Sequence, residues 1–496
     1  MLFSFIPTMI VAMVVVGQTP TDSDKHFRVP PGERQLFLDD VGVSEIHNLK
    51  RTMHPPTKQG AVIPPDRPWE TTLQTRCAPA WDPSAKRFKL WMITSMNIPM
   101  GGMTYAESKD GLHWTKPNLR QKMINGNLDN NLVTVDPKLD WPANAIENVV
   151  YDATDPDPSR RFKGLAHAFG REPIVSPDGI HWKRLDVPAI ASQDESNLSF
   201  DEREHLFILT VKQGGPYGRS VYLSTSKDFE QWTKPRLIFH ADKLDQKLGQ
   251  KHIKARRADP SLQLQRALWD IRDTYKGHTA EPKVDVYNMG LFRYEGLYIG
   301  MPSMFHSNDN RWNKDGFHLI QLVCSRDLKT FKRLGDRKTF IGPSPMGENV
   351  YDLTQLIGPS SPVIHSDELW FYYTGIRYRT LPKNLEHGAG AICLAVLRRD
   401  GFISLDSEDS EGSILTEPFE LLGSKLFVNV DVPQGELQVE LLDRNGKVVA
   451  FSKPISGDLT HAGVEWAEGD IDPMKNQNVS LRFTLRDGQF YSYWLE

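Results

Sequence analysis

The sequence predicts an all-β chain, in which a five-bladed β-propeller is followed by a small C-terminal β-sandwich domain. The first observation behind this prediction is the phrase Ser-x-Asp-Gly-x-His-Trp, which occurs at residues 108–114 and 176–182. It returns without its glycine at 226–232, and in weaker form at 325–331 and 399–402. The second observation is that β-rich runs flank each copy, and about five such repeats favour a radial array of sheets. The third is that alternating strands without the phrase follow the last copy.

The chemistry of the repeated phrase is that of a tight turn. Glycine supplies a positive φ, and the Ser and Asp side chains accept hydrogen bonds from backbone N–H groups inside the turn. The aromatic residue then starts the outer strand and packs between neighbouring sheets. A structural role therefore explains the phrase, and we expect no active-site residue within it.

Composition fits a turn-rich β protein with no polyanionic partner. The 496 residues include 36 Gly and 34 Pro, and the net charge is −4 with acids and bases interspersed. The one basic cluster, at residues 251–257, is interpreted as a solvated face of an insertion, and no nucleic acid partner is predicted. The three cysteines, Cys77, Cys324 and Cys393, lack metal-site spacing. We expect small buried core residues, with a Cys324–Cys393 disulfide as the alternative.

The N-terminus predicts export. Residues 1–17 are apolar and end in small residues that suit a signal-peptidase site, although no Lys or Arg precedes Lys25. A membrane anchor is the alternative, but the run is short and Pro7 interrupts it. Residues 18–34 are expected to be a flexible N-terminus, and the mature protein to be secreted or periplasmic, without a membrane partner.

Taken in order, the repeats divide the propeller, residues 35–416, into five blades. The early strand at 35–41 is expected to complete the last blade, because joining the ends of a ring removes an exposed strand edge. The first strand of each repeat marks the start of a blade. The predicted blades are residues 71–119, 144–187, 195–238, 285–341 and 352–405.

Two further segments complete the chain. An insertion at residues 240–284 separates the third and fourth blades, and apolar spacing predicts a helix at 260–275 within it. Residues 417–496 form the predicted β-sandwich, with an Asn-Gly hairpin turn inside the stretch 443–446.

The five hairpins and the early strand Leu-Phe-Leu-Asp-Asp at 36–40 resemble the five-bladed propeller superfamily of glycoside hydrolases, families 32 and 43 and their relatives. That strand, the segment Pro-Asp-Arg-Pro-Trp-Glu at 65–70 and the C-terminal tail are also similar to secreted hypothetical proteins of planctomycetes within this group. The signature Trp-Met-Asn-Asp-Pro-Asn-Gly of the invertase-like family is absent, which argues against fructan hydrolysis.

The resemblance implies three carboxylates at or before the innermost strands of successive blades: a base or nucleophile, a helper and a general acid. Glycosidic cleavage needs one protonated carboxyl group at the leaving oxygen and one ionised carboxylate across the sugar. Burial and mutual repulsion separate their pKa values. In order of preference the candidates are Asp194, Asp285, Glu70 and Glu348, with Glu147 as the candidate helper. Each is also explained as an ordinary loop acid.

Polar and aromatic residues near the same strand ends are the candidate sugar contacts. Sugars bind by bidentate hydrogen bonds and by stacking on aromatic rings. The candidates are Arg76, Asn148, Asn197, Tyr287, His306, Arg377 and Tyr378, although a satisfied loop histidine explains His306 equally well. No cofactor and no metal site are expected, and the resemblance leaves room for a structural Ca²⁺ in the central channel.

The functional prediction is a secreted glycoside hydrolase that cleaves plant or algal oligosaccharides. The first alternative is a non-catalytic carbohydrate-binding or scaffold propeller, and the second is a carbohydrate-active lyase with a His or Tyr base. Carboxylates that are all neutralised by Arg or Lys would favour binding alone. Products with an unsaturated, ultraviolet-absorbing ring would favour the lyase.

Overall fold

The computed structural model describes residues 27–94, 103–124, 126–136, 146, 148–258, 283–307, 316–347, 349–378, 388–408 and 410–496. Within these ranges β-strands dominate, and a single α-helix, α1 (Lys243–Ala258), accompanies a few 3-10 turns. The prediction of an all-β chain is therefore confirmed. The predicted signal peptide, the predicted helix at 260–275, Glu147 and Glu348 lie outside the described residues.

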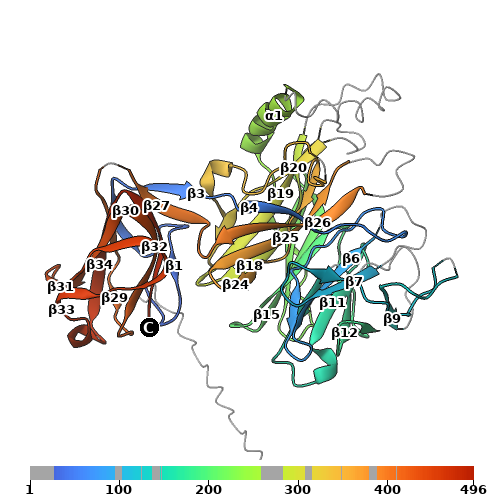
Figure 1. Ribbon diagram of the computed structural model, residues 1–496, viewed down its shortest axis with the longest axis horizontal. Helices are drawn as coiled ribbons and strands as arrows, with labels where there is room; N and C mark the ends of the chain where they lie inside the picture. Colours follow the sequence, from blue (N-terminus) through green and yellow to red (C-terminus); the bar gives the residue numbers. More distant parts are fainter. Residues whose placement is uncertain are drawn as a thin grey trace, which may run out of the picture.

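Five antiparallel units of four or five strands follow one another along the chain (Figure 1). Unit 1 consists of β5 (Ala80–Asp82), β6 (Arg87–Ile93), β7 (Met103–Ser108) and β8 (Trp114–Thr115). Unit 2 consists of β10 (Asn148–Tyr151), β11 (Phe162–Ala166), β12 (Glu172–Ser176) and β13 (His181–Arg184). Between them β9 (Leu132–Asp136) pairs with both β7 and β13, which joins the two units into one nine-stranded sheet.

The other three units form separate sheets. Unit 3 consists of β14 (Ser196–Asp201), β15 (Leu206–Gly215), β16 (Gly218–Ser226) and β17 (Arg236–Phe239). Unit 4 consists of β18 (Lys283–Tyr294), β19 (Leu297–Ser307), β20 (Gly316–Ile320), β21 (Val323–Ser325) and β22 (Lys332–Arg333). Unit 5 consists of β23 (Gln355–Ile357), β24 (Val363–His365), β25 (Glu368–Ile376), β26 (Gly390–Arg398) and β4 (Thr57–Ile63).

Strands of successive units contact one another around an axis. Strand β10 lies against both β5 and β14, β14 lies against β18, and β20 lies against β23. The last unit meets the first, because Thr75 N–H donates to Thr374 Oγ1 at 2.8 Å and that hydroxyl donates to the Thr75 carbonyl at 2.9 Å. These contacts are those of a closed ring, and the count of five propeller blades stays a prediction.

The strand that completes unit 5 is β4, and the prediction that residues 35–41 would do so is wrong. Strand β4 pairs antiparallel with β26 and covers the edge that β26 would otherwise expose. Lys58 of β4 also forms an ion pair with the buried Asp352 at 2.7 Å, which ties the strand to its unit. Only Gln35 and Leu36 of the predicted strand have β structure, as β1 (Gln35–Leu36).

Residues from both ends of the chain form the second sheet. Its C-terminal strands are β27 (Ile403–Ser407), β28 (Gly412–Thr416), β29 (Phe419–Glu420), β30 (Leu426–Asp443), β31 (Val448–Ser452), β32 (Ile455–Gly463), β33 (Trp466–Gly469), β34 (Asn478–Arg486) and β35 (Gly488–Leu495). They pair with β1, β2 (Val43–His47) and β3 (Lys50–Met53). The predicted start of this unit at residue 417 is therefore wrong, because the sheet already includes β27 and β28 and also takes in three N-terminal strands. The sheet surrounds its own apolar core, beside the ring (Figure 1). A two-layered sandwich stays a prediction.

The repeated phrase forms the predicted turn. At residues 108–114, Gly111 N–H donates to Ser108 Oγ at 2.9 Å and His113 N–H donates to Asp110 Oδ1 at 2.8 Å. The glycine position has φ 78° at Gly111, and the copies without glycine keep it positive, with 66° at Phe229 and 58° at Leu328. These copies therefore retain the left-handed turn at a conformational cost that glycine avoids.

The three cysteines are free and buried, so the predicted small core residues are confirmed and the Cys324–Cys393 disulfide is absent. Cys324 and Cys393 both belong to the apolar core shared by units 4 and 5. No helix of the described residues is long and apolar enough to cross a bilayer.

Candidate functional site

Charged side chains gather where the inner strands of units 3 and 4 begin; we call this end of the ring the upper mouth. Its innermost pair joins Arg76 to Glu195, with Arg76 Nη2 2.6 Å from Glu195 Oε1 and a second contact from Arg76 Nε. Both side chains are at most 3% exposed. Burial opposes ionisation of Glu195, but Arg76, Lys212 and a hydrogen bond from Tyr287 hold the pKa of this carboxyl well below its usual range.

Asp194 lies next to this pair and is the exposed carboxylate of the cluster, with a side chain 46% exposed. Its Oδ2 is 2.7 Å from Lys212 Nζ, and Lys212 also lies 3.8 Å above the Tyr287 ring. Burial lowers the pKa of Lys212, against the opposing effect of Asp194 and Glu195.

The backbone of Asp194 has a φ of 125°, in a region that is almost restricted to glycine. The conformation is held because the Asp194 carbonyl accepts hydrogen bonds from Arg171 and from Ser192 Oγ. Strain of this kind costs about 1–3 kcal/mol and concentrates at functional sites. The geometry therefore singles out Asp194 among the candidate carboxylates.

Asp285, in β18, is fully engaged with Arg219. Arg219 Nε and Nη2 lie 2.9 and 2.7 Å from the two carboxylate oxygens, and the Asp285 side chain is 3% exposed. Arg219 also lies 4.7 Å from the centre of the Phe305 ring. A carboxylate with both oxygens bound to one guanidinium is positioned to hold that cation rather than to exchange protons with a substrate.

Hydrogen-bonded amide side chains occupy the centre of the ring beneath the upper mouth. Asn197 Nδ2 donates to the backbone carbonyls of Arg76 at 3.0 Å and Gly358 at 3.1 Å. Asn288 Nδ2 donates to Asn197 Oδ1 at 2.9 Å, and Ser360 Oγ donates to the Arg76 carbonyl at 2.6 Å. Units 1, 3, 4 and 5 are thus bound together across the centre. Asn197 therefore acts as an internal brace, and not as the predicted sugar contact.

Asn148, at the start of β10, donates from Nδ2 to Ser196 Oγ at 3.0 Å, while its buried Oδ1 has no hydrogen-bond partner within the part of the chain that the structure describes. A buried acceptor of this kind carries a desolvation cost, which a bound water or ligand group would relieve. Of the predicted contacts, Asn148 thus keeps an unused acceptor near the mouth.

Glu70 is not brought to the mouth. Its fully buried carboxylate accepts from Lys116 Nζ at 2.6 Å and from the backbone of Asp66 at 3.0 Å, on the side of unit 1 where the outer strand β8 ends. Burial raises the pKa of Glu70 despite the Lys116 ammonium group. The proline-rich segment before Glu70 runs along the outside of the unit, which is why a position ahead of the inner strand does not lead to the axis.

The remaining predicted contacts also have other roles or lie apart. His306 is buried and stacks on Phe317, and His252 of α1 lies 3.2 Å from its Nε2. Burial lowers the pKa of His306 to about 3, so the ring is neutral and anchors the helix. Arg377 donates to the Val350 carbonyl at 2.8 Å and lies over the Tyr351 ring, and Tyr378 is half-buried.

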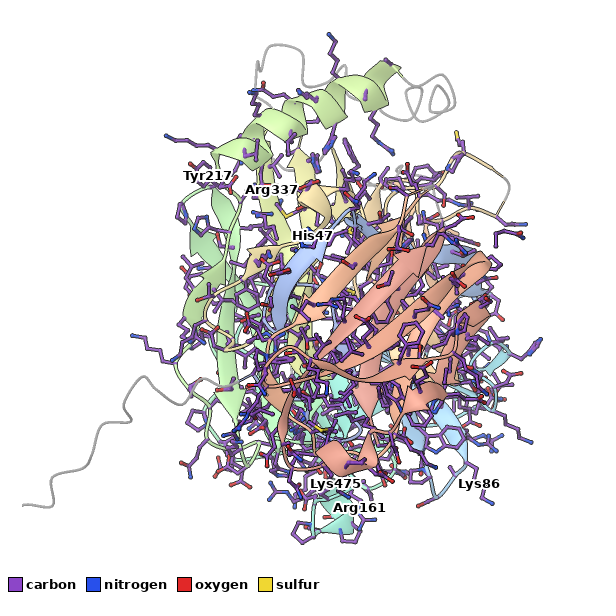
Figure 2. The ribbon with its side chains drawn as sticks, turned by 90° about the vertical axis from the view of Figure 1, so that its left-hand side faces the viewer. His47, Lys86, Arg161, Tyr217, Arg337 and Lys475 are labelled. Carbon is purple, nitrogen blue, oxygen red and sulfur yellow. The ribbon has the colours of Figure 1, made fainter. Side chains whose placement is uncertain are left out.

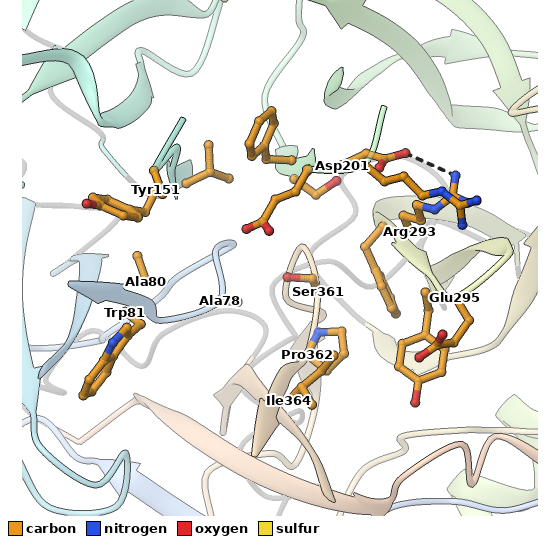
Figure 3. Close-up of a pocket in the computed structure, with 18 of the residues that line it drawn as sticks. Ala78, Ala80, Trp81, Tyr151, Asp201, Arg293, Glu295, Ser361, Pro362 and Ile364 are labelled. Atoms are coloured by element: carbon orange, nitrogen blue, oxygen red, sulfur yellow. Dashed lines mark ion pairs between the residues drawn. The ribbon is translucent and has the colours of Figure 1, made fainter. Parts of the chain in front are cut away.

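A cavity bounded by described residues lies at the opposite end of the axis, where the inner strands end; we call it the lower mouth (Figure 3). It has a volume of about 870 Å³, whereas the cavity beside Glu195, Lys212 and Tyr287 measures about 10 Å³, enough for one water molecule. The lower mouth therefore has the room, and the upper mouth has the carboxylates.

Equivalent positions of all five units line the lower mouth. They lie at or next to the end of a strand in each unit, namely Trp81, Tyr151, Phe200, Arg293 and Ile364. The first three pair across the hairpin with the aromatic residues Phe88, Phe162 and Phe207. Sequence reasoning missed this set, although the triplets Ala-Trp-Asp, Val-Tyr-Asp and Ser-Phe-Asp at 80–82, 150–152 and 199–201 are a visible signal.

The described residues contain no group of three or more His, Cys, Asp or Glu side chains able to hold a metal ion. Glu195, a buried carboxylate of the upper mouth, is already paired with Arg76. The described residues thus do not fit a Ca²⁺ ion in the central channel.

No protein-family model matches the chain, and a search of curated proteins finds no match. Solved structures show a distant likeness. A glycoside hydrolase has 13% identity and a TM-score of 0.42 over 69% of this chain and 92% of its own. The GH32 beta-fructofuranosidase of Bombyx mori has 8% identity and a TM-score of 0.39 over 89% and 94%. A family 43 arabinoxylan arabinofuranohydrolase from Bacillus subtilis has 10% identity and a TM-score of 0.36 over 88% and 99%. Likeness at this level assigns no activity.

Proposed function

We propose that the protein is a secreted glycoside hydrolase that cleaves plant or algal oligosaccharides at the upper mouth of a five-bladed propeller. The observation that carries the proposal is the state of Asp194, a half-exposed carboxylate with a strained backbone beside a buried Lys212. Hydrolysis of a glycosidic bond requires a carboxylate that a sugar can approach, and Asp194 has a side chain 46% exposed, whereas those of Asp285 and Glu70 are buried.

The proposed roles follow from the contacts. Asp194 acts as the base or nucleophile, and its ion pair with Lys212 fixes the carboxylate. Glu195, held by Arg76, is the helper that sets the charge balance around it. A protonated acid is also needed, and neither Asp285 nor Glu70 suits that role, because Arg219 and Lys116 engage them away from solvent. Glu147 and Glu348 are the proposed sources of the general acid.

The test is reducing-end release from a panel of plant and algal oligosaccharides. Asp194→Asn should lower turnover about 100-fold or more, the usual contribution of a positioned general base or acid. Asp186→Asn, an exposed aspartate without a side-chain partner among the described residues, is the matched control and should keep full activity. Full activity of Asp194→Asn, with an unchanged circular dichroism spectrum, would refute the assignment.

The same assay identifies the acid. Either Glu147→Gln or Glu348→Gln should remove the alkaline limb of the pH–rate profile, because that limb reports the protonated group. If both variants keep the limb, the acid is another residue. Products that absorb in the ultraviolet would show that the enzyme is a lyase and not a hydrolase.

Non-catalytic carbohydrate binding is the second candidate, and one observation favours it. The three described candidate carboxylates and Glu195 all carry an Arg or Lys partner: Lys212–Asp194, Arg219–Asp285, Lys116–Glu70 and Arg76–Glu195. In that case sugar would bind without turnover, and the aromatic lining of the lower mouth is the natural place for it. Calorimetric binding that Trp81→Ala weakens, with no reducing ends released, would establish this candidate.

A further inference from the structure

Helix α1 is fixed at the upper end of the ring by an anchored N-terminus. Leu244 and Asp245 N–H groups donate to Asp242 Oδ1 at 2.9 and 3.0 Å, and Asp242 N–H donates back to Asp245 Oδ2 at 2.9 Å. This is a reciprocal capping arrangement. Arg333 and Arg337 of unit 4 bind the same two carboxylates at 2.5–2.9 Å. The helix is therefore fixed in position and in rotation.

One face of α1 packs on the ring. Asp245, Gly249 and Ile253 are buried at i, i+4 and i+8. A Cβ atom on Gly249 would lie 2.1 Å from Val284 Cγ2, so helix and β18 are in close contact. Gln246 completes the contact with two hydrogen bonds to the Val284 backbone, at 2.7 and 2.9 Å.

The opposite face carries a stripe of four exposed lysines. Lys243, Lys247, Lys251 and Lys254 follow one another at intervals of four, four and three residues. At 3.6 residues per turn they fall within about 80° of one another, on the side away from the buried residues. With a rise of 1.5 Å per residue the stripe is about 16 Å long. Figures 1 and 2 show the helix at the top of the molecule, beyond the ends of the sheets.

The lysine stripe has no counter-charges among the described residues. None of its four ammonium groups forms an ion pair there, and the one acid of α1, Asp245, is bound to Arg333 and Arg337. Like charges at i,i+4 destabilise a helix, and Lys243 in the first turn also opposes the helix dipole. The chain as a whole has a net charge of −4, so the stripe does not follow from a basic composition. Four exposed lysines at a helical spacing, without an ion pair among the described residues, thus concentrate positive charge on one face of α1.

We infer that the lysine stripe of α1 binds a linear anionic polysaccharide, one that carries carboxylate or sulfate groups. The length of the stripe suits a run of negative charges along an extended polymer, which releases counter-ions on binding. The choice of a polysaccharide over other polyanions rests on the proposed function. The surface itself does not, because none of the four lysines belongs to the upper mouth.

The test measures binding of the full chain to polygalacturonate and to carrageenan, with neutral arabinan for comparison. Both polyanions should bind, with affinity falling at least about tenfold between 0.05 and 0.2 M salt. The quadruple variant K243Q/K247Q/K251Q/K254Q should lose about tenfold or more in affinity and most of the salt dependence. Gln is a good helix former, so circular dichroism should stay unchanged.

The matched control is K109Q/K183Q/K234Q/K475Q, which removes four exposed lysines from other surfaces and should bind as the wild type. Equal loss in both quadruple variants would overturn the inference, since charge alone would then explain binding. Tighter binding to duplex DNA or to phosphatidylserine vesicles than to either polysaccharide would also overturn it. Asp194→Asn should still bind the polyanions, which separates this inference from the proposed catalysis.

Discussion

Asp400 offers the sharpest test of how the ring is joined to the C-terminal sheet. Its fully buried Oδ2 accepts from Arg34 Nη1 and Ser492 Oγ at 2.6 Å and from Asn429 Nδ2 at 3.1 Å, and its Oδ1 accepts from Tyr294 OH at 2.6 Å. Tyr294 belongs to β18 of the ring, whereas Asn429 and Ser492 belong to the C-terminal sheet. One carboxylate therefore joins three parts of the chain.

Asp400→Asn keeps the volume of the side chain and removes its charge. The backbone at this position has a φ of 63°, which Asn tolerates, so the substitution adds no conformational strain. Arg34, whose side chain is 11% exposed, loses its counter-charge. Removal of one partner from a buried ion pair costs about 3–5 kcal/mol, and we expect the free energy of unfolding to fall by that amount.

Urea unfolding followed by tryptophan fluorescence is a suitable assay, because Arg34 lies 3.8 Å from the centre of the buried Trp494 ring. The control is Asp487→Asn, an exposed aspartate with a φ of 48°, which should change stability by about 0.5 kcal/mol at most. A loss of less than about 1 kcal/mol for Asp400→Asn would refute the view that this carboxylate joins the sheets.

The pH dependence follows from the same contacts. Burial alone would raise the pKa of Asp400, but Arg34, Ser492 and Tyr294 together hold that pKa below its usual value. The stabilisation is therefore complete above about pH 4, the unfolded pKa, and is lost as pH falls through the folded pKa. Wild type and Asp400→Asn should thus converge in stability only in acid.

Two other predictions concern packing and thiols. Gly290→Ala should destabilise the ring by about 1–3 kcal/mol, because the new Cβ would lie 1.9 Å from the Pro359 carbonyl oxygen of unit 5. Gly214→Ala, with no atom within 4 Å of its Cβ, should not, and equal urea midpoints for both would contradict the packing argument. All three cysteines should resist maleimide until the chain unfolds, since burial also raises the pKa of Cys324 to about 11. Labelling of the native protein would contradict their burial.

Local chemistry made the repeats predictable. The Ser and Asp side chains bind backbone groups within a few residues of themselves, so the turn at residues 108–114 can be predicted from those residues alone. The strand that completes unit 5 was not predictable in this way. The sequence predicts residues 35–41 as that strand, and the pairing of β4 in its place depends on a partner, β26, more than 300 residues away.

The candidate site was predictable in part. Asp194 and Asp285 lie near the starts of β14 and β18, at the upper mouth, and their catalytic roles stay a prediction. Their partners Lys212 and Arg219 were missed: Lys212, in β15, binds Asp194 within unit 3, and Arg219, in β16, binds Asp285 of the neighbouring unit 4. A lysine within an apolar strand such as 206–215 was the available signal. Glu70 does not lie at the upper mouth, because the segment before it runs along the outside of unit 1.

The pairing of both chain ends has a consequence for synthesis. Strands β1 to β4 emerge from the ribosome first, but their partners β26, β27, β28 and β35 follow hundreds of residues later. At about 5–20 residues per second the early strands wait for tens of seconds with open edges. Lys50, Arg51 and Lys58 place charge along those edges, a common protection against premature pairing. A nascent chain halted before β26 would hold an open ring and an unfinished second sheet.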